Sequence, residues 1–124
     1  MLKSAAGRVA PAVLLLALCA GGAAAQSWKP ERNVEIVSGT AAGGAVDKAN
    51  RLVQKIWQDR KVVEVPMAVV NKPGGGNTIA WAYLNQHAGD GHYVCVAPYT
   101  ILTNKIVGSS TLNYADFSVL SLLF

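Results

Sequence analysis

Two glycine-rich turns carry the residues of this chain that are best suited to bind a ligand. The first, SGTAAGG at 38–44, follows the apolar stretch VEIV, and the second, PGGGNT at 73–78, follows the apolar stretch MAVV. A glycine turn placed before a helix directs several free backbone N–H groups and the positive end of the helix dipole at one point. The sequence therefore predicts an anion site made mainly of backbone.

The side chains around these turns disfavour a nucleotide. Gly39 and Gly44 have the spacing of a P-loop, but Ala45 and Val46 stand where that loop requires lysine and serine or threonine. Neither turn contains the G-x-G-x-x-G of a dinucleotide site. A carboxylate held by neutral donors and water suits the nearby polar side chains better, although either turn alone could be a plain tight turn. These side chains are Thr40, Asn77, Thr78, Thr100 and Asn104.

Residues suited to catalysis or metal binding are sparse. The chain contains two histidines, His87 and His92, and neither a G-x-S-x-G nor an H-E-x-x-H motif. Asp47 falls in the first helical turn after the glycines, where the helix dipole and the turn's own N–H groups favour a carboxylate without catalysis. The sequence therefore predicts no catalytic residue, no metal and no cofactor. A small secreted α/β enzyme that uses Asp47 or His92 is a less favoured alternative.

The elements that must position these turns alternate between strand and helix. Strands are expected at 34–39, 67–71, 93–97 and 117–124, and helices at 44–60, 78–87 and 100–107. This order predicts an α/β fold, a parallel-type sheet with covering helices whose strands all end at one edge. Ligands of open α/β sheets bind at that edge, so we expect both turns to meet there. The first helix should bury one apolar face: Val46, Ala49, Leu52, Val53, Ile56 and Trp57.

The amino-terminal residues and the charge indicate a secreted protein. Residues 1–25 read as a signal peptide, because Lys3 and Arg8 precede an apolar run that ends in small residues. Loss of this segment would lower the formal net charge from +4 to +2. The remaining basic residues are scattered, which disfavours nucleic acid as a partner. Cys95, inside an apolar stretch, is expected to be a buried and inert thiol.

Four motifs in order resemble those of the solute-binding receptors of tripartite tricarboxylate transporters, the Bug family. Gly43 and Gly44 followed by Asp47 and Arg51 are similar to the GG-x-x-D of the family's first turn. NKPGGG at 71–76 is similar to its N-[RK]-P-G-x-G turn. DGHY at 90–93 resembles the family's entry to the third strand, and NYADF at 113–117 resembles the region that follows that strand.

This resemblance implies part of the first lobe of a two-lobed, type II periplasmic binding protein, with residues 26–124 as an incomplete N-terminal lobe. Such a receptor captures a small carboxylate in the periplasm, works with membrane permease subunits, does no chemistry and is expected to be a monomer when complete. Because the chain ends on the apolar run FSVLSLLF, we expect a truncated receptor, and a fragment that does not bind is the main alternative. Carried over by position, the ligand-facing residues are Thr40, Gly44, Gly75, Gly76, Asn77, Thr78, Thr100 and Asn104.

Overall fold

Three parallel strands form a small open sheet at the centre of the fold. The computed structural model describes residues 28–123, so the expected signal peptide at 1–25 and Phe124 lie outside the described residues. Strand β1 (Val34–Ser38) lies between β2 (Met67–Asn71) and β3 (Tyr93–Cys95), and both neighbours are parallel to it. The predicted α/β fold with a parallel sheet is therefore confirmed.

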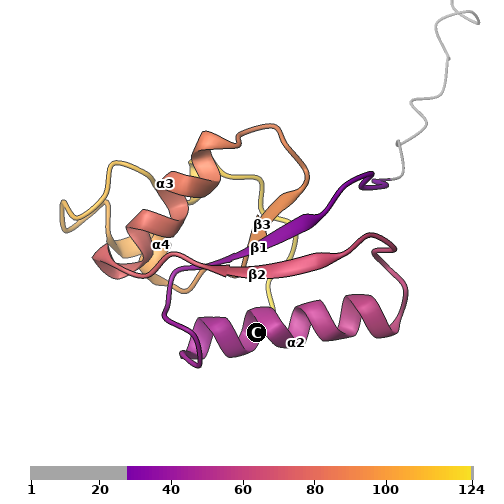
Figure 1. The fold of residues 1–124 in the computed structure, drawn as a ribbon. Helices are drawn as coiled ribbons and strands as arrows, with labels where there is room; N and C mark the ends of the chain where they lie inside the picture. Colours follow the sequence, from indigo (N-terminus) through magenta and orange to yellow (C-terminus); the bar gives the residue numbers. More distant parts are fainter. Residues whose placement is uncertain (1–27, 124) are drawn as a thin grey trace, which may run out of the picture.

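The helices cover both faces of this sheet. Because β2 and β3 lie on opposite sides of β1, the two crossovers run in opposite directions and place their helices on opposite faces. Figure 1 shows α2 (Ala45–Asp59) along one face and α3 (Thr78–Gln86) along the other. Shorter elements are η1 (Gly75–Asn77), α4 (Thr100–Thr103) and η2 (Tyr114–Asp116). Within residues 28–123, every helix is too short or too polar to cross a membrane.

The main apolar core lies between the sheet and α2. Side chains alternate between the two faces of a strand, so Val34 and Ile36 point to the same side, where both are at most 1% exposed. They pack with Val63 and Met67, and partly buried side chains surround them: Trp57, Val65, Val69 and Val94. On the opposite face α3 contacts β1 and β3 and buries Trp81, which is 1% exposed. Each helix therefore fixes one face of the sheet.

Several elements are shorter than the sequence predicts. Strand β3 ends at Cys95 rather than at residue 97, and α4 ends at Thr103 rather than at residue 107. The expected strand at 117–124 is wrong for residues 117–123, which form no ladder with any described strand. A strand-forming sequence becomes a strand only where its backbone finds a partner. Without one, the apolar side chains of this segment stay in solvent, and Leu122 is 87% exposed.

The expectation that α2 buries one continuous apolar face is also wrong in part. Leu52 is 59% exposed and Ile56 is 43% exposed. The partly buried stripe is narrower, and it is formed by Val46, Ala49, Val53 and Trp57. Three strands make a narrow sheet, which covers only this stripe of the helix surface. The side chains beside the stripe therefore remain uncovered.

We expect Trp81→Ala to lower the free energy of unfolding by about 3–5 kcal/mol, because it removes the largest fully buried side chain and leaves a cavity. Urea unfolding followed by circular dichroism measures the change. Asn85→Ala, on an exposed position of the same helix, should stay within about 0.5 kcal/mol of the wild type. Equal effects of the two substitutions would contradict the burial of α3 against the sheet.

Candidate functional site

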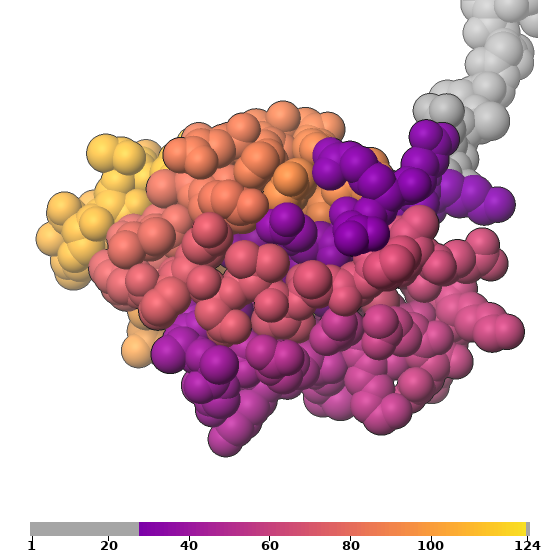
Figure 2. All heavy atoms as spheres, in the orientation of Figure 1, coloured from indigo at the N-terminus to yellow at the C-terminus, as the bar shows by residue number. Residues whose placement is uncertain are grey.

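The carboxyl ends of the strands form the candidate site. The order β2-β1-β3 reverses direction at β1, so the topological switch point of this sheet lies between the carboxyl ends of β1 and β3. The turn at 39–44, the turn at 72–77 and the segment at 96–99 all leave the sheet at this edge. Figure 2 shows the first two of these turns as adjoining parts of one surface, at the left of the molecule.

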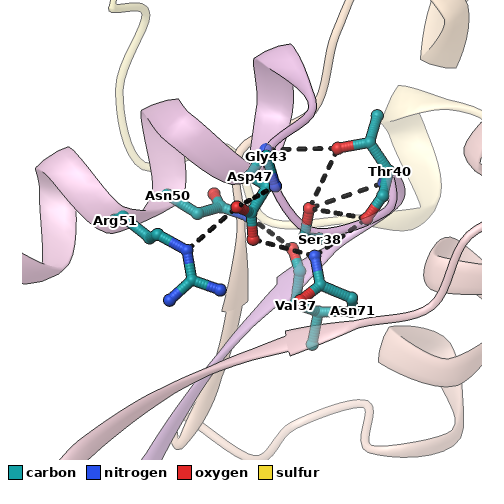
Figure 3. A network of polar contacts seen from close by, with 8 residues as sticks. All are labelled: Val37, Ser38, Thr40, Gly43, Asp47, Asn50, Arg51 and Asn71. Carbon is teal, nitrogen blue, oxygen red and sulfur yellow. Dashed lines mark hydrogen bonds and ion pairs between the residues drawn. The ribbon is translucent and has the colours of Figure 1, made fainter.

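The first turn is occupied by a carboxylate of the protein itself. Asp47 is 1% exposed, and its Oδ2 accepts hydrogen bonds from the Gly43 N–H at 2.8 Å and from Arg51 Nε at 2.9 Å (Figure 3). Its Oδ1 accepts a third bond from Asn71 Nδ2, also at 2.8 Å. The anion position at the start of α2 therefore holds Asp47, which binds the turn's own amide as the sequence predicts.

Thr40 and Gly44 build this turn. The Thr40 hydroxyl accepts a bond from the Asp47 N–H at 3.2 Å, which satisfies one of the free donors at the start of α2. The Thr40 carbonyl accepts a second bond from Asn71 Nδ2 at 2.8 Å. A Cβ on Gly44 would lie 2.8 Å from the Thr40 side chain, so only glycine fits there. Both predicted site residues thus shape the backbone of the first turn.

The contacts of Asp47 also set its protonation. The bond from Arg51, then the Gly43 N–H and then the Asn71 amide stabilise the charged form, and together they outweigh the effect of burial. They hold the pKa of Asp47 far below its ordinary value of 3.8. Asp47 is therefore a permanent anion at neutral pH and is poorly suited to exchange protons with a substrate.

The second turn and the exit of β3 are joined by amide side chains. Asn77 Nδ2 donates to the Thr100 hydroxyl at 3.2 Å, and Asn104, which is 8% exposed, donates from Nδ2 to the Gly76 carbonyl at 2.9 Å. The first turn touches the same group, because a Cβ on Gly39 would lie only 2.1 Å from Asn77 Oδ1. The three loops therefore meet, as expected from the strand order.

The glycines of the second turn adopt a conformation that other residues rarely reach. Gly75 and Gly76 have φ values of 55° and 61°, and Asn77 follows in the same left-handed region at 77°. Both glycines are exposed. A Cβ on Gly75 would lie only 2.2 Å from the Thr78 hydroxyl oxygen and would clash with it. This turn presents exposed backbone at the start of α3, which suits an acceptor ligand.

Asn50 is a site residue that our sequence analysis missed. Its side chain is fully buried on α2, where Nδ2 donates to the Val37 carbonyl at 3.1 Å and Oδ1 accepts from the Val96 N–H at 3.2 Å. It thereby links β1 to the chain after β3. The available signal was an asparagine between Ala49 and Val53 of the predicted apolar face, a position where a polar side chain needs buried partners.

The histidines lie at the opposite, amino-terminal edge of the sheet. His92 precedes β3 and its Nδ1 lies 2.7 Å from Asp90 Oδ1, while Asp90 also pairs with Arg32. The His87 ring stacks on Tyr93 with a centroid separation of 3.8 Å. Asp47 lies at the carboxyl edge, so Asp47 and His92 are separated by the length of the strands. The two residues considered for an enzyme are therefore not parts of one site.

Cys95 is partly buried, and not buried as the sequence predicts, although its surroundings still favour an inert thiol. Burial raises the pKa of the Cys95 thiol to about 11, so it carries little thiolate at neutral pH. No three His, Cys, Asp or Glu side chains within residues 28–123 are grouped so that they could hold a metal ion.

Of two hollows on the surface, one includes a residue of the glycine turns. One of about 500 Å³ is found at the carboxyl end of α2, and its lining includes Gln58, Lys61 and Val63. The other, of about 300 Å³, lies between α3 and the segment 109–112 and includes the predicted site residue Thr78. The glycines of both turns lie outside these two hollows.

Comparisons with known proteins do not place this chain in a family. No family model, no curated protein and no solved structure matches it.

We expect the protein to become less stable as the pH falls, because the charged form of Asp47 stabilises the fold. A carboxylate whose pKa is lowered on folding stabilises the fold above its ordinary pKa of 3.8, and this contribution is lost progressively as the pH falls below about 5. Thermal melting between pH 7 and pH 3 should show a smaller loss for Asp47→Asn than for the wild type. Asp59→Asn, which removes an exposed carboxylate from the same helix, should keep the wild-type slope. Parallel slopes for all three proteins would contradict this role of Asp47.

We expect Gly39→Ala to destabilise the fold by about 1–3 kcal/mol, because the new Cβ would overlap the Asn77 amide. Asn77→Gly removes that amide and suits the left-handed backbone at this position. In the Asn77→Gly background, Gly39→Ala should therefore cost much less. A double-mutant cycle by urea unfolding measures the coupling, and additive effects would show that the first and second turns do not touch.

Proposed function

We propose that this chain is the ligand-holding part of a solute-binding protein for a small carboxylate. The observation that carries the proposal is the meeting of three loops at the switch point of a parallel sheet. Gly39 lies against Asn77, Asn77 bonds to Thr100, and Asn104 bonds to Gly76. Open α/β sheets bind their ligands at this point.

The chemistry of this edge favours a carboxylate over a phosphate. The eight predicted ligand-facing residues are glycine, threonine and asparagine, so they supply neutral donors and no cation. Backbone N–H groups and the amino end of α3 can stabilise a single negative charge, and water can bridge the remaining acceptors. A phosphate with two negative charges would normally recruit arginine or lysine. Arg51 on α2 is already paired with Asp47, and the amine of Lys72 in the second turn lies over the Tyr83 ring, 4.3 Å from its centroid.

The motif resemblance gives the proposal its biological setting. The three-stranded parallel sheet and its covering helices in residues 28–123 are consistent with part of the first lobe of a type II periplasmic binding protein. In this proposal the chain is exported to the periplasm, and a second lobe would close over the ligand. The receptor would be a monomer when complete and would deliver its ligand to the permease subunits of a tripartite tricarboxylate-type transporter.

A second candidate is a fragment that does not bind by itself. This candidate is favoured because polar side chains of the edge already form hydrogen bonds within the protein. Asn77 bonds to Thr100, and the Thr40 hydroxyl caps α2. It is also favoured by the open form of the edge, because the two described hollows include only one residue of the glycine turns, Thr78. In this case a ligand would need additional protein surface to hold it.

Isothermal titration calorimetry with succinate, malate and citrate separates the two candidates. We expect at least one of these acids to bind, and Thr100→Val to weaken that binding about tenfold by removing a hydroxyl beside Asn77, about 1.4 kcal/mol. Thr103→Val makes the same change on an exposed position of α4 and should leave the affinity unchanged. No binding of any of the three acids would contradict the proposed function and favour the second candidate.

A further inference from the structure

We propose that Asn50 is a spacer that holds β1 and β3 apart at their carboxyl ends and so sets the width of the ligand crevice. This inference rests on the proposed function for its effect on binding, but the spacer itself is a feature of the fold. Asn50 is a positioning residue in this proposal, because it acts through the strands and does not itself touch the ligand.

The register of β1 and β3 shows which backbone hydrogen bond Asn50 replaces. Glu35 pairs with Tyr93 and Val37 pairs with Cys95, and the Glu35 N–H donates to the His92 carbonyl at 2.8 Å. Continued in this register, a parallel ladder would next join the Val96 N–H to the Val37 carbonyl. Both of these groups bond to the Asn50 side chain instead. The amide therefore takes the place of one ladder hydrogen bond.

In this proposal the two bonds of Asn50 keep β1 and β3 apart beyond the pair of Val37 and Cys95. An amide side chain offers one donor and one acceptor, so it satisfies both backbone groups and stands between them. Asn50 is 0% exposed, which keeps water from replacing it. This insertion also accounts for the early end of β3 at Cys95, two residues before the predicted end. The sequence of the segment 93–97 favours a longer strand, but its partner is held away.

The position of the spacer connects it to the candidate site. Val37 lies two residues before Gly39, and Val96 lies four residues before Thr100, so both loops of the crevice begin at the spacer. If the Val96 N–H bonded directly to the Val37 carbonyl, the chain at 96–100 would approach Gly39. Asn77 already lies against Gly39 and bonds to Thr100, so closure would displace it. Crevice width and loop position are therefore coupled through one side chain.

Scalar couplings through hydrogen bonds, measured by NMR on the isotope-labelled protein, test the spacer directly. In the wild type we expect the Val96 amide nitrogen to couple to the side-chain carbonyl carbon of Asn50. In Asn50→Ala the coupling should move to the backbone carbonyl carbon of Val37, because the ladder closes. Asn50→Asp keeps the acceptor for Val96 but loses the amide donor to the Val37 carbonyl, so we expect only the coupling from Val96 to the side-chain carbonyl carbon to remain. Asn85→Ala on α3 serves as the control that changes an exposed asparagine.

The spacer is overturned if the wild type lacks the coupling from Val96 to Asn50, and this result does not require any variant to fold. It is also overturned if folded Asn50→Ala shows no coupling from Val96 to Val37. If Asn50→Ala does not fold, the wild type and Asn50→Asp decide, and loss of the Val96 coupling in Asn50→Asp would count against the spacer.

Calorimetry with succinate and citrate tests the effect on the crevice. A narrower crevice should penalise the larger acid more, so we expect Asn50→Ala to change the ratio of the citrate and succinate dissociation constants at least fivefold. A residue that only stabilises the fold would leave this ratio unchanged, and an unchanged ratio in folded Asn50→Ala overturns the positioning role. If the wild type binds none of succinate, malate and citrate, the proposed function fails, and the NMR couplings still decide whether Asn50 is a spacer.

Discussion

The burial of one carboxylate constrains this fold more than any other single interaction. A charge cannot leave water unless it is paired and fully hydrogen-bonded, and Asp47 meets this condition only because three elements supply its donors. Gly43 contributes from the first turn, Arg51 from α2 and Asn71 from β2. The turn after β1 is therefore fixed relative to its helix and to the neighbouring strand. The same arrangement fills the first anion position with Asp47, whereas the second turn holds the exposed glycines Gly75 and Gly76.

Amide side chains extend this order across the carboxyl edge of the sheet. Each of four asparagines joins two separate parts of the chain: one of them, Asn50, uses both its donor and its acceptor, and the other three donate from Nδ2. These residues are Asn50, Asn71, Asn77 and Asn104. The opposite edge is different, since it gathers charged and aromatic groups such as Arg32, Asp90 and Tyr93. The sheet thus has a polar, largely neutral edge where the loops meet and a charged edge where the strands begin.

The apolar surface of the molecule reflects the small number of strands. Three strands cover a narrow stripe of α2, so Leu52 and Ile56 stay in solvent, and the segment 117–123 has no ladder to join. Uncovered apolar side chains on a helix and on an extended segment offer surface for further protein contacts. In the proposed receptor, a more complete sheet and a second lobe would reduce this exposure.

The sequence by itself determined the alternation of strand and helix, the parallel sheet and the positions of both glycine turns, because these depend on local periodicity and on backbone freedom at glycine. It also indicated the structural role of Asp47, which follows from its place in the first turn of a helix. Only the tertiary structure decided where β3 ends, because that depends on Asn50, which lies more than 40 residues earlier in the chain than Val96. The same holds for Phe117 and the residues after it, whose strand preference could not be realised without a partner. Local structural preferences depend on neighbouring residues, whereas hydrogen bonds between residues that are distant in sequence form only when the chain folds.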